Sequence, residues 1–85
     1  MGDIKVGIIE KYFKNIGVAA IRLTDGVLNK GDIIHIKGHT TDIKQSVDSM
    51  QMEHQFVDSG KIGDSVGIKV IDKVRDGDIV YKVSD

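Results

Sequence analysis

The stretch Lys30–Gln55, KGDIIHIKGHTTDIKQSVDSMQMEHQ, decides the fold of this chain. It predicts two strands, residues 32–37 and 41 to about 54, joined by the polar turn Gly38-His39-Thr40. The apolar positions of the second strand change faces part of the way along it, so a bulge is expected near Asp48-Ser49. The expected core positions of this hairpin are Ile34, Ile36, Ile43, Val47, Met50 and Met52.

Strand patterns continue on both sides of the hairpin. Residues 4–13 begin with alternating apolar and polar positions, and a slip at Ile8-Ile9 predicts a bulge or bend. A strand is expected at residues 16–23, where the small residues Gly17, Ala19 and Ala20 would allow close packing between layers. Further strands are expected at residues 66–70 and 79–83. Because isoleucine and valine dominate the apolar set, the sequence predicts an all-β domain.

The dipeptide Gly-Asp introduces three of the apolar segments. It occurs at Gly31-Asp32, Gly63-Asp64 and Gly77-Asp78. Glycine readily adopts the left-handed backbone that tight turns require, and aspartate can accept hydrogen bonds from the turn backbone. We therefore interpret the dipeptide as a turn device. The unequal spacings of 32 and 14 residues exclude a repeat of fixed period.

Length and composition set further limits. Eighty-five residues predict one domain, residues 1–85. A net charge of −1, from 12 basic and 13 acidic residues, argues against a strongly electrostatic nucleic-acid binder, although it permits a local basic patch. The absence of cysteine excludes disulfides and thiolate zinc sites. With no apolar run of about 20 residues and no signal-peptide layout, we expect a cytoplasmic protein without membrane contact.

No catalytic motif is present, so the sequence does not predict an enzyme. It lacks both the G-x-S-x-G elbow of α/β-hydrolases and the phosphate loop of GTPases. The histidines His35, His39 and His54 have no recognisable ligand spacing, so no metal and no other cofactor is expected. Convergence of His35 and His39 near Asp42 across the turn remains possible on sequence grounds.

Three segments together resemble domain 2 of translation elongation factors of the Tu and 1-alpha type. They are NIGVAAIRLTDGVLNKGDIIHI at residues 15–36, the pattern Val47-x-Ser49-Met50-x-Met52-x-His54, and GDSVGI at residues 63–68. Residues 36–51, IKGHTTDIKQSVDSMQ, are also similar to the C-terminal β-barrel module of collagenase-like peptidase family proteins. The resemblance implies a small six- or seven-stranded antiparallel Greek-key β-barrel.

The resemblance also implies a function. In the elongation factors this domain packs on a GTPase domain and helps to hold the acceptor end of aminoacyl-tRNA. This chain has Gln51 where the factor pattern carries a glutamate, and it has no GTPase domain, which argues against direct delivery of aminoacyl-tRNA.

Two hypotheses of different classes follow. The first is a stand-alone, non-catalytic binding module that contacts RNA (tRNA or rRNA) or the translation machinery. The alternative is a protein–protein interaction module that acts in trans with a collagenase-like peptidase family enzyme or with another complex. A monomer without a small-molecule substrate is expected in either case. The residues expected to contact RNA or the partner are Lys37, His39 and Lys44 near the turn, with Tyr12 or Phe13 nearby, and Gln51, Glu53 and His54.

Overall fold

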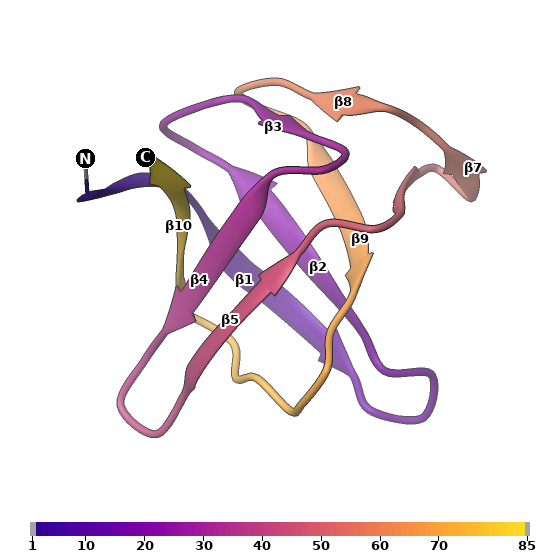
Figure 1. Ribbon diagram of the computed structural model, residues 1–85. Helices are drawn as coiled ribbons and strands as arrows, with labels where there is room; N and C mark the ends of the chain where they lie inside the picture. The colour runs from indigo at the N-terminus through magenta and orange to yellow at the C-terminus, as the bar shows by residue number, and fades with distance from the viewer. Residues whose placement is uncertain (1, 85) are drawn as a thin grey trace.

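The computed structural model describes residues 2–84 and is built from β-strands (Figure 1). The two terminal residues of the expected domain 1–85 lie outside this range. The strands are β1 (Gly2–Phe13), β2 (Val18–Leu23), β3 (Leu28–Asn29), β4 (Ile33–Lys37), β5 (Asp42–Ser46), β6 (Met50–Met52), β7 (Gln55–Phe56), β8 (Ser59–Gly60), β9 (Ser65–Lys69) and β10 (Ile79–Ser84). Six of them have five or more residues, and all pairings are antiparallel, so the predicted fold class is confirmed.

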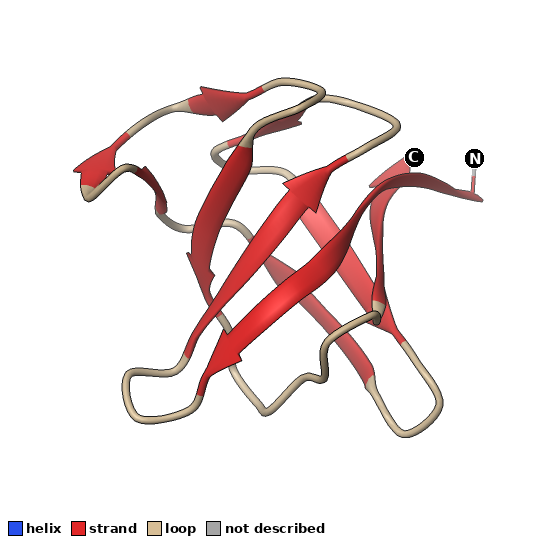
Figure 2. Ribbon diagram, turned by 180° about the vertical axis from the view of Figure 1, so that it is seen from behind, coloured by secondary structure: helices blue, strands red, loops and turns tan. Residues whose placement is uncertain are grey.

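The main sheet has eight strands in the order β5-β4-β10-β1-β2-β9-β6-β7, and β3 pairs with β8 in a separate small sheet. The main sheet curls around the core, as the views from the two sides show (Figures 1 and 2). The last strand, β10, lies between β4 and β1, so the end of the chain joins two strands from its first half. None of the described residues belongs to a helix long and apolar enough to cross a membrane.

The core collects the inward-facing residues of the long strands. In the β4–β5 hairpin, Ile34 and Ile36 are fully buried and Ile43 nearly so, while Ile33 is 39% exposed. The expected core positions of the opening stretch are therefore confirmed, with Met52 only partly buried against the core. The other buried apolar residues are Val6, Ile9, Ala19, Ile21, Leu23, Leu28, Val66, Ile68, Val70, Val74 and Val80.

Strand β1 contains two register irregularities. One lies within residues 5–7 against β10, and the other lies within residues 9–11 against β2. The slip expected at Ile8-Ile9 is therefore misplaced, because Gly7, Ile8 and Ile9 pair with β2 in register and the two irregularities lie on either side of them. As a result Val6 and Ile9 both face the core, whereas Ile4 is 60% exposed, so the simple alternation expected at the start of this strand is wrong.

The prediction of one continuous strand from residue 41 to about 54, with a bulge at Asp48-Ser49, is also wrong. Strand β5 ends at Ser46, although Val47 is still bonded to the segment that leads into β4: its N–H donates to the Asp32 carbonyl (2.8 Å), and its carbonyl accepts from the Gly31 N–H (2.8 Å). After this break β6 pairs with β9, near the opposite end of the sheet order. The break therefore carries the chain across the barrel. The strand expected to start at residue 16 starts instead at Val18.

The three Gly-Asp dipeptides form one recurring turn, as predicted. In each turn the glycine has a positive φ, and the aspartate carboxylate accepts a hydrogen bond from the backbone N–H three residues earlier. The φ angles of Gly31, Gly63 and Gly77 are 96°, 97° and 91°, and the distances from the Asn29, Lys61 and Arg75 nitrogens to Asp32, Asp64 and Asp78 Oδ2 are 2.8, 3.1 and 2.9 Å.

Candidate functional site

A groove of about 370 Å³ lies on the outer face of the sheet, over β2, β9 and β6. Its floor is low because two small residues, Ala20 on β2 and Gly67 on β9, pair there. Gly67 pairs in turn with Gln51 on β6, which stands at the side of the floor. The neighbours of these residues along the strands, Ala19 and Val66, point into the core. Of the small residues expected to allow close packing, Ala19 does so, whereas Ala20 lines the groove floor.

The two walls of the groove differ in chemistry. One wall is apolar and comes from the end of β1 and the following turn, where Phe13 is 40% exposed and Ile16 is 64% exposed. The Lys11 ammonium lies 5.3 Å from the centre of the Phe13 ring, within the range of a cation–π contact. The other wall carries Gln51, Glu53 and His54, so three of the six residues predicted to contact a ligand are brought together here.

Gly67 has no packing reason to be glycine. A Cβ atom at this position would lie 3.4 Å from Val18 Cγ1 and 3.9 Å from the Gln51 carbonyl oxygen, and its φ is not in the left-handed region. Glycine inside a strand weakens the strand, and it often marks a place where a ligand or another backbone approaches closely. The missing side chain keeps the groove floor open.

The turn that carries Glu53 and His54 has an unusual backbone. Both residues have positive φ angles, 52° and 66°, and they form the two-residue loop between the paired residues Met52 and Gln55. A hairpin loop with two positive φ angles strongly favours Asn-Gly, because larger side chains are strained in this conformation. The sequence therefore places two residues with long polar side chains and a strained backbone at the edge of the groove.

We expect the double substitution Glu53→Asn, His54→Gly to raise the free energy of unfolding by about 1 kcal/mol, because it relieves this strain. Urea unfolding of the purified chain measures the effect. The matched control, Glu53→Gln with His54→Gln, keeps long side chains in the same conformation and should leave stability unchanged. A loss of stability in the Asn-Gly variant would show that the native side chains support the fold.

A polar network borders the groove at Ser65. The Arg22 guanidinium contacts Glu10 Oε2 through Nη2 at 2.8 Å and through Nε at 2.9 Å, and the Ser65 hydroxyl donates to Glu10 Oε1 at 3.0 Å. The hydrogen bonds from Arg22 and then Ser65 lower the pKa of the Glu10 carboxyl. The network joins β1, β2 and β9 and holds the Ser65 side chain at one end of the groove floor.

The other three predicted contact residues lie elsewhere. Lys37 ends β4, Lys44 lies on β5, and His39 lies in the connection between them; all three are exposed. The β4–β5 connection and β7 lie at opposite ends of the molecule (Figure 1). The six residues therefore form two separate groups. Phe13, expected near the lysine group, lines the groove instead, and Tyr12 packs partly against the core.

On the outer face of β4, the His35 side chain contacts two carboxylates, one from β1 and one from β5. Its Nδ1 lies 3.2 Å from Asp3 Oδ2, and its Nε2 contacts Asp42 Oδ1. The hydrogen bond from His35 lowers the pKa of the Asp42 carboxyl. His39 takes no part in these contacts, and within residues 2–84 no three His, Asp or Glu side chains could together hold a metal ion. The cluster links β1, β4 and β5.

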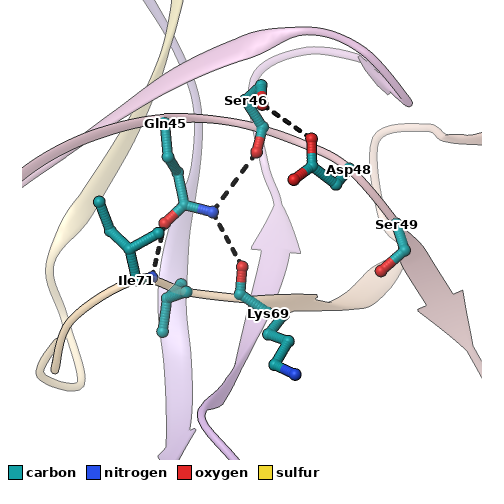
Figure 3. Close-up of a pocket in the computed structure, with 7 residues that line it drawn as sticks. Gln45, Ser46, Asp48, Ser49, Lys69 and Ile71 are labelled. Atoms are coloured by element: carbon teal, nitrogen blue, oxygen red, sulfur yellow. Dashed lines mark hydrogen bonds between the residues drawn. The ribbon is translucent and has the colours of Figure 1, made fainter.

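A second hollow, of about 350 Å³, lies between β5 and the segment that follows β9 (Figure 3). Here the Gln45 side chain hydrogen-bonds to the backbone of the segment after β9, in place of a pairing between two strands. Its amide nitrogen donates to the Lys69 carbonyl at 2.8 Å, and its amide oxygen accepts from the Ile71 N–H at 2.9 Å. These bonds join β5 to the far side of the barrel, so we assign this hollow a structural role in closing the sheet.

Sequence reasoning found the polar wall of the groove but missed its floor and apolar wall. The missed residues are Phe13 as part of this site, Ile16, Val18, Ala20, Ser65 and Gly67. The available signal was an alternation within residues 65–69, in which Val66 and Ile68 point inward and Gly67 therefore points outward. An outward glycine in the middle of a strand is a weak but usable sign of a contact surface.

Comparison with known proteins identifies the relatives of the chain. Residues 17–81 match the family model described as elongation factor Tu domain 2. The chain is 39% identical over 83 residues to an uncharacterized protease of Methanocaldococcus jannaschii, and 40% identical over 80 residues to a collagenase of Porphyromonas gingivalis. These matches cover 96% and 93% of this chain but only 20% and 19% of the relatives.

Solved structures share the fold. The C-terminal domain of a U32 peptidase from Geobacillus thermoleovorans superposes with a TM-score of 0.86 at 17% identity, covering 92% of this chain and 98% of that one. A bacterial selenocysteine-specific elongation factor superposes with a TM-score of 0.73 at 20% identity, covering 95% of this chain and 15% of that one. Taken with the family model, which matches most of the sequence, these findings establish that the chain belongs to the elongation factor Tu domain 2 family.

Proposed function

We propose that this chain is a non-catalytic binding module that takes an unpaired RNA end (of tRNA or rRNA) into the groove over β2, β9 and β6. The observation that carries the proposal is the shape and chemistry of the groove: a floor of small residues between an apolar wall and a polar wall. An unstacked base needs an apolar or aromatic surface for its face and hydrogen-bonding groups for its edge. Phe13 and Ile16 can supply the first, and Gln51 can supply the second.

The charges near the groove are consistent with a modest affinity for RNA. Lys69 pairs with Val18 at one end of the floor, and Lys11 lies beside Phe13, so two ammonium groups are available for phosphates. The net charge of −1 removes any strong general attraction. We therefore expect base contacts to dominate the affinity and the dependence on salt to be shallow.

Binding of a fluorescent single-stranded RNA and of a tRNA with a free 3′ end tests this function by anisotropy at low salt. The substitution Gly67→Val, which raises the floor, should weaken binding about tenfold, because loss of one stacked base costs roughly 1–3 kcal/mol. Phe13→Ala should have a similar effect. The charge reversals Lys37→Glu and Lys44→Glu, made in the distant group, are the matched controls and should change binding by less than about twofold.

Two results would overturn the RNA proposal. The first is the absence of binding by the wild-type chain even at low salt. The second is binding that the groove substitutions leave unchanged while the Lys37 and Lys44 substitutions abolish it, because the lysine group would then carry the affinity alone.

A second candidate function rests on the relatives. The chain matches 20% of the length of a protease and 19% of the length of a collagenase, at 39–40% identity. This supports a role as an accessory protein-binding module that acts with an enzyme of the collagenase-like peptidase family, the chemistry being performed by the enzyme.

A further inference from the structure

Strand β10 is apolar on both of its faces. Its sequence, Ile79-Val80-Tyr81-Lys82-Val83, places Val80 in the core with 0% exposure. The alternate residues Ile79, Tyr81 and Val83 point to the outer face, where they are half-buried. An antiparallel strand with one face in water normally alternates apolar and polar residues, and a nearly continuous apolar run is typical of a strand covered on both faces.

The apolar surface extends onto both neighbouring strands. Ile79 pairs with Ile8 on β1, and Ile33 on β4, which is 39% exposed, lies beyond His35 on the same outward-facing side. The outer β10 surface is therefore defined as Ile8, Ile33, Ile79, Tyr81 and Val83. It lies on a different part of the barrel from the groove, because β4, β10 and β1 precede β2 and β9 in the sheet order.

Basic residues border this surface. Tyr81 pairs with Lys5, Ile79 pairs with Lys37, and Lys44 lies one strand further out, opposite His35. The acidic residues on the same face, Asp3 and Asp42, are both directed to His35, and Lys5 lies 3.7 Å from Asp25. Lys37 and Lys44 form none of the ion pairs found among residues 2–84; Lys37 lies opposite Asp42 on β5, whereas Lys44 lies opposite His35, so Lys44 offers the free positive charge of the border.

We propose that the outer β10 surface docks onto the enzyme part of a collagenase-like peptidase family protein. The matching surface of the enzyme would be an apolar patch bordered by carboxylates. The proposal rests on the second candidate function and assigns it a surface. Three features support this occupant. The surface is largely aliphatic, which suits a protein better than RNA; its border is basic; and about four fifths of the length of the matching relatives lies outside the matched segment.

Site-specific photo-crosslinking in native cells tests the docking. A benzoylphenylalanine residue replaces Tyr81 in one version of the full chain and Gln51, in the groove, in the control version. We expect the residue at position 81 to crosslink to an enzyme that mass spectrometry identifies as a collagenase-like peptidase family protein, at a surface segment containing Asp or Glu. No crosslink from position 81, or a crosslink only to RNA, to a second copy of this chain or to an unrelated protein, would overturn the proposal.

The affinity for the captured enzyme gives the quantitative test. Ile79→Lys and Val83→Lys should each weaken binding at least about tenfold, because each places a charge at an apolar contact. Tyr81→Ala provides a variant without added charge and should also weaken binding, and circular dichroism checks that each variant is folded. Gly67→Val should leave enzyme binding unchanged.

The same variants separate the possible failures. If an enzyme binds but only groove substitutions weaken the binding, the surface assignment is wrong while the second candidate function stands. If no such enzyme is captured, the second candidate function fails together with the surface. RNA binding by the β10 variants should equal that of the wild-type chain, so the RNA proposal is tested independently.

Discussion

Replacing Gly7 with alanine is expected to lower the free energy of unfolding by about 3 kcal/mol, a large fraction of the stability of so small a domain. A Cβ atom at Gly7 would lie 2.2 Å from the carbonyl oxygen of Arg22 and 3.2 Å from the Cα of Leu23. Both contacts are with the backbone of the paired strand β2, which cannot rotate away as a side chain could. Strands β1 and β2 would therefore have to separate at Gly7, which pairs with Leu23. Urea unfolding followed by circular dichroism measures the change.

The matched control is Gly67→Ala. Gly67 is also a strand glycine without a left-handed backbone, but its added Cβ would meet neighbours only at ordinary contact distances of 3.4 and 3.9 Å. Alanine there should leave stability unchanged or raise it by up to about 1 kcal/mol, because glycine loses more backbone freedom on folding. Equal losses for the two substitutions would contradict the argument, since the cost would then come from strand propensity and not from the backbone contact.

The pair of glycines shows where sequence reasoning reaches its limit. A pattern of alternating residues indicates that Gly67 points outward, and it can therefore suggest an open surface. The same pattern says nothing about how closely β1 and β2 approach at Gly7, because it does not encode which backbone atoms of the partner strand face that position. The need for glycine at Gly7 is a property of the assembled sheet.

The turns could be predicted because their causes are local. In all three Gly-Asp dipeptides, the residues that define the turn lie within four positions of one another, so the sequence contains the whole device. The turn at Glu53-His54 could not be predicted in this way. Its two positive φ angles arise although Glu53 does not favour that conformation, so the surrounding strands β6 and β7 impose it.

The prediction of one continuous strand through residues 47–49 failed for a related reason. Val47 and Met50 are both buried, which a bulged continuous strand would also produce. The distinguishing fact is the partner of the second half: β6 pairs with β9 and not with the strand before it. Pairing partners depend on long-range topology, which periodicity does not encode. The groove was missed for the same reason, since its two walls come from segments that only this topology brings together.

The second large effect is expected at the contact between Asp78 and Gly38. Asp78 is 6% exposed, and its Oδ2 accepts a hydrogen bond from the Arg75 N–H at 2.9 Å. Asp78→Ala should therefore lower the free energy of unfolding by about 2 kcal/mol, since it leaves a partly buried N–H without its acceptor. The equivalent Asp64→Ala, in a turn of the same design but with a more exposed aspartate, should cost only about 1 kcal/mol.

Gly38→Ala tests the other side of this contact. A Cβ atom at Gly38 would lie 1.9 Å from Asp78 Oδ1, so the carboxylate would have to leave the position in which it closes the turn. We expect Gly38→Ala alone to cost about 2 kcal/mol, as much as removing the carboxylate, and to cost less than about 1 kcal/mol when Asp78 is already alanine, because the obstructing atoms are then gone. Urea unfolding of the two single variants and the double variant gives the coupling energy. Additive losses would show that Gly38 is required by its own backbone, and that the Asp78 turn and the β4–β5 connection do not constrain each other.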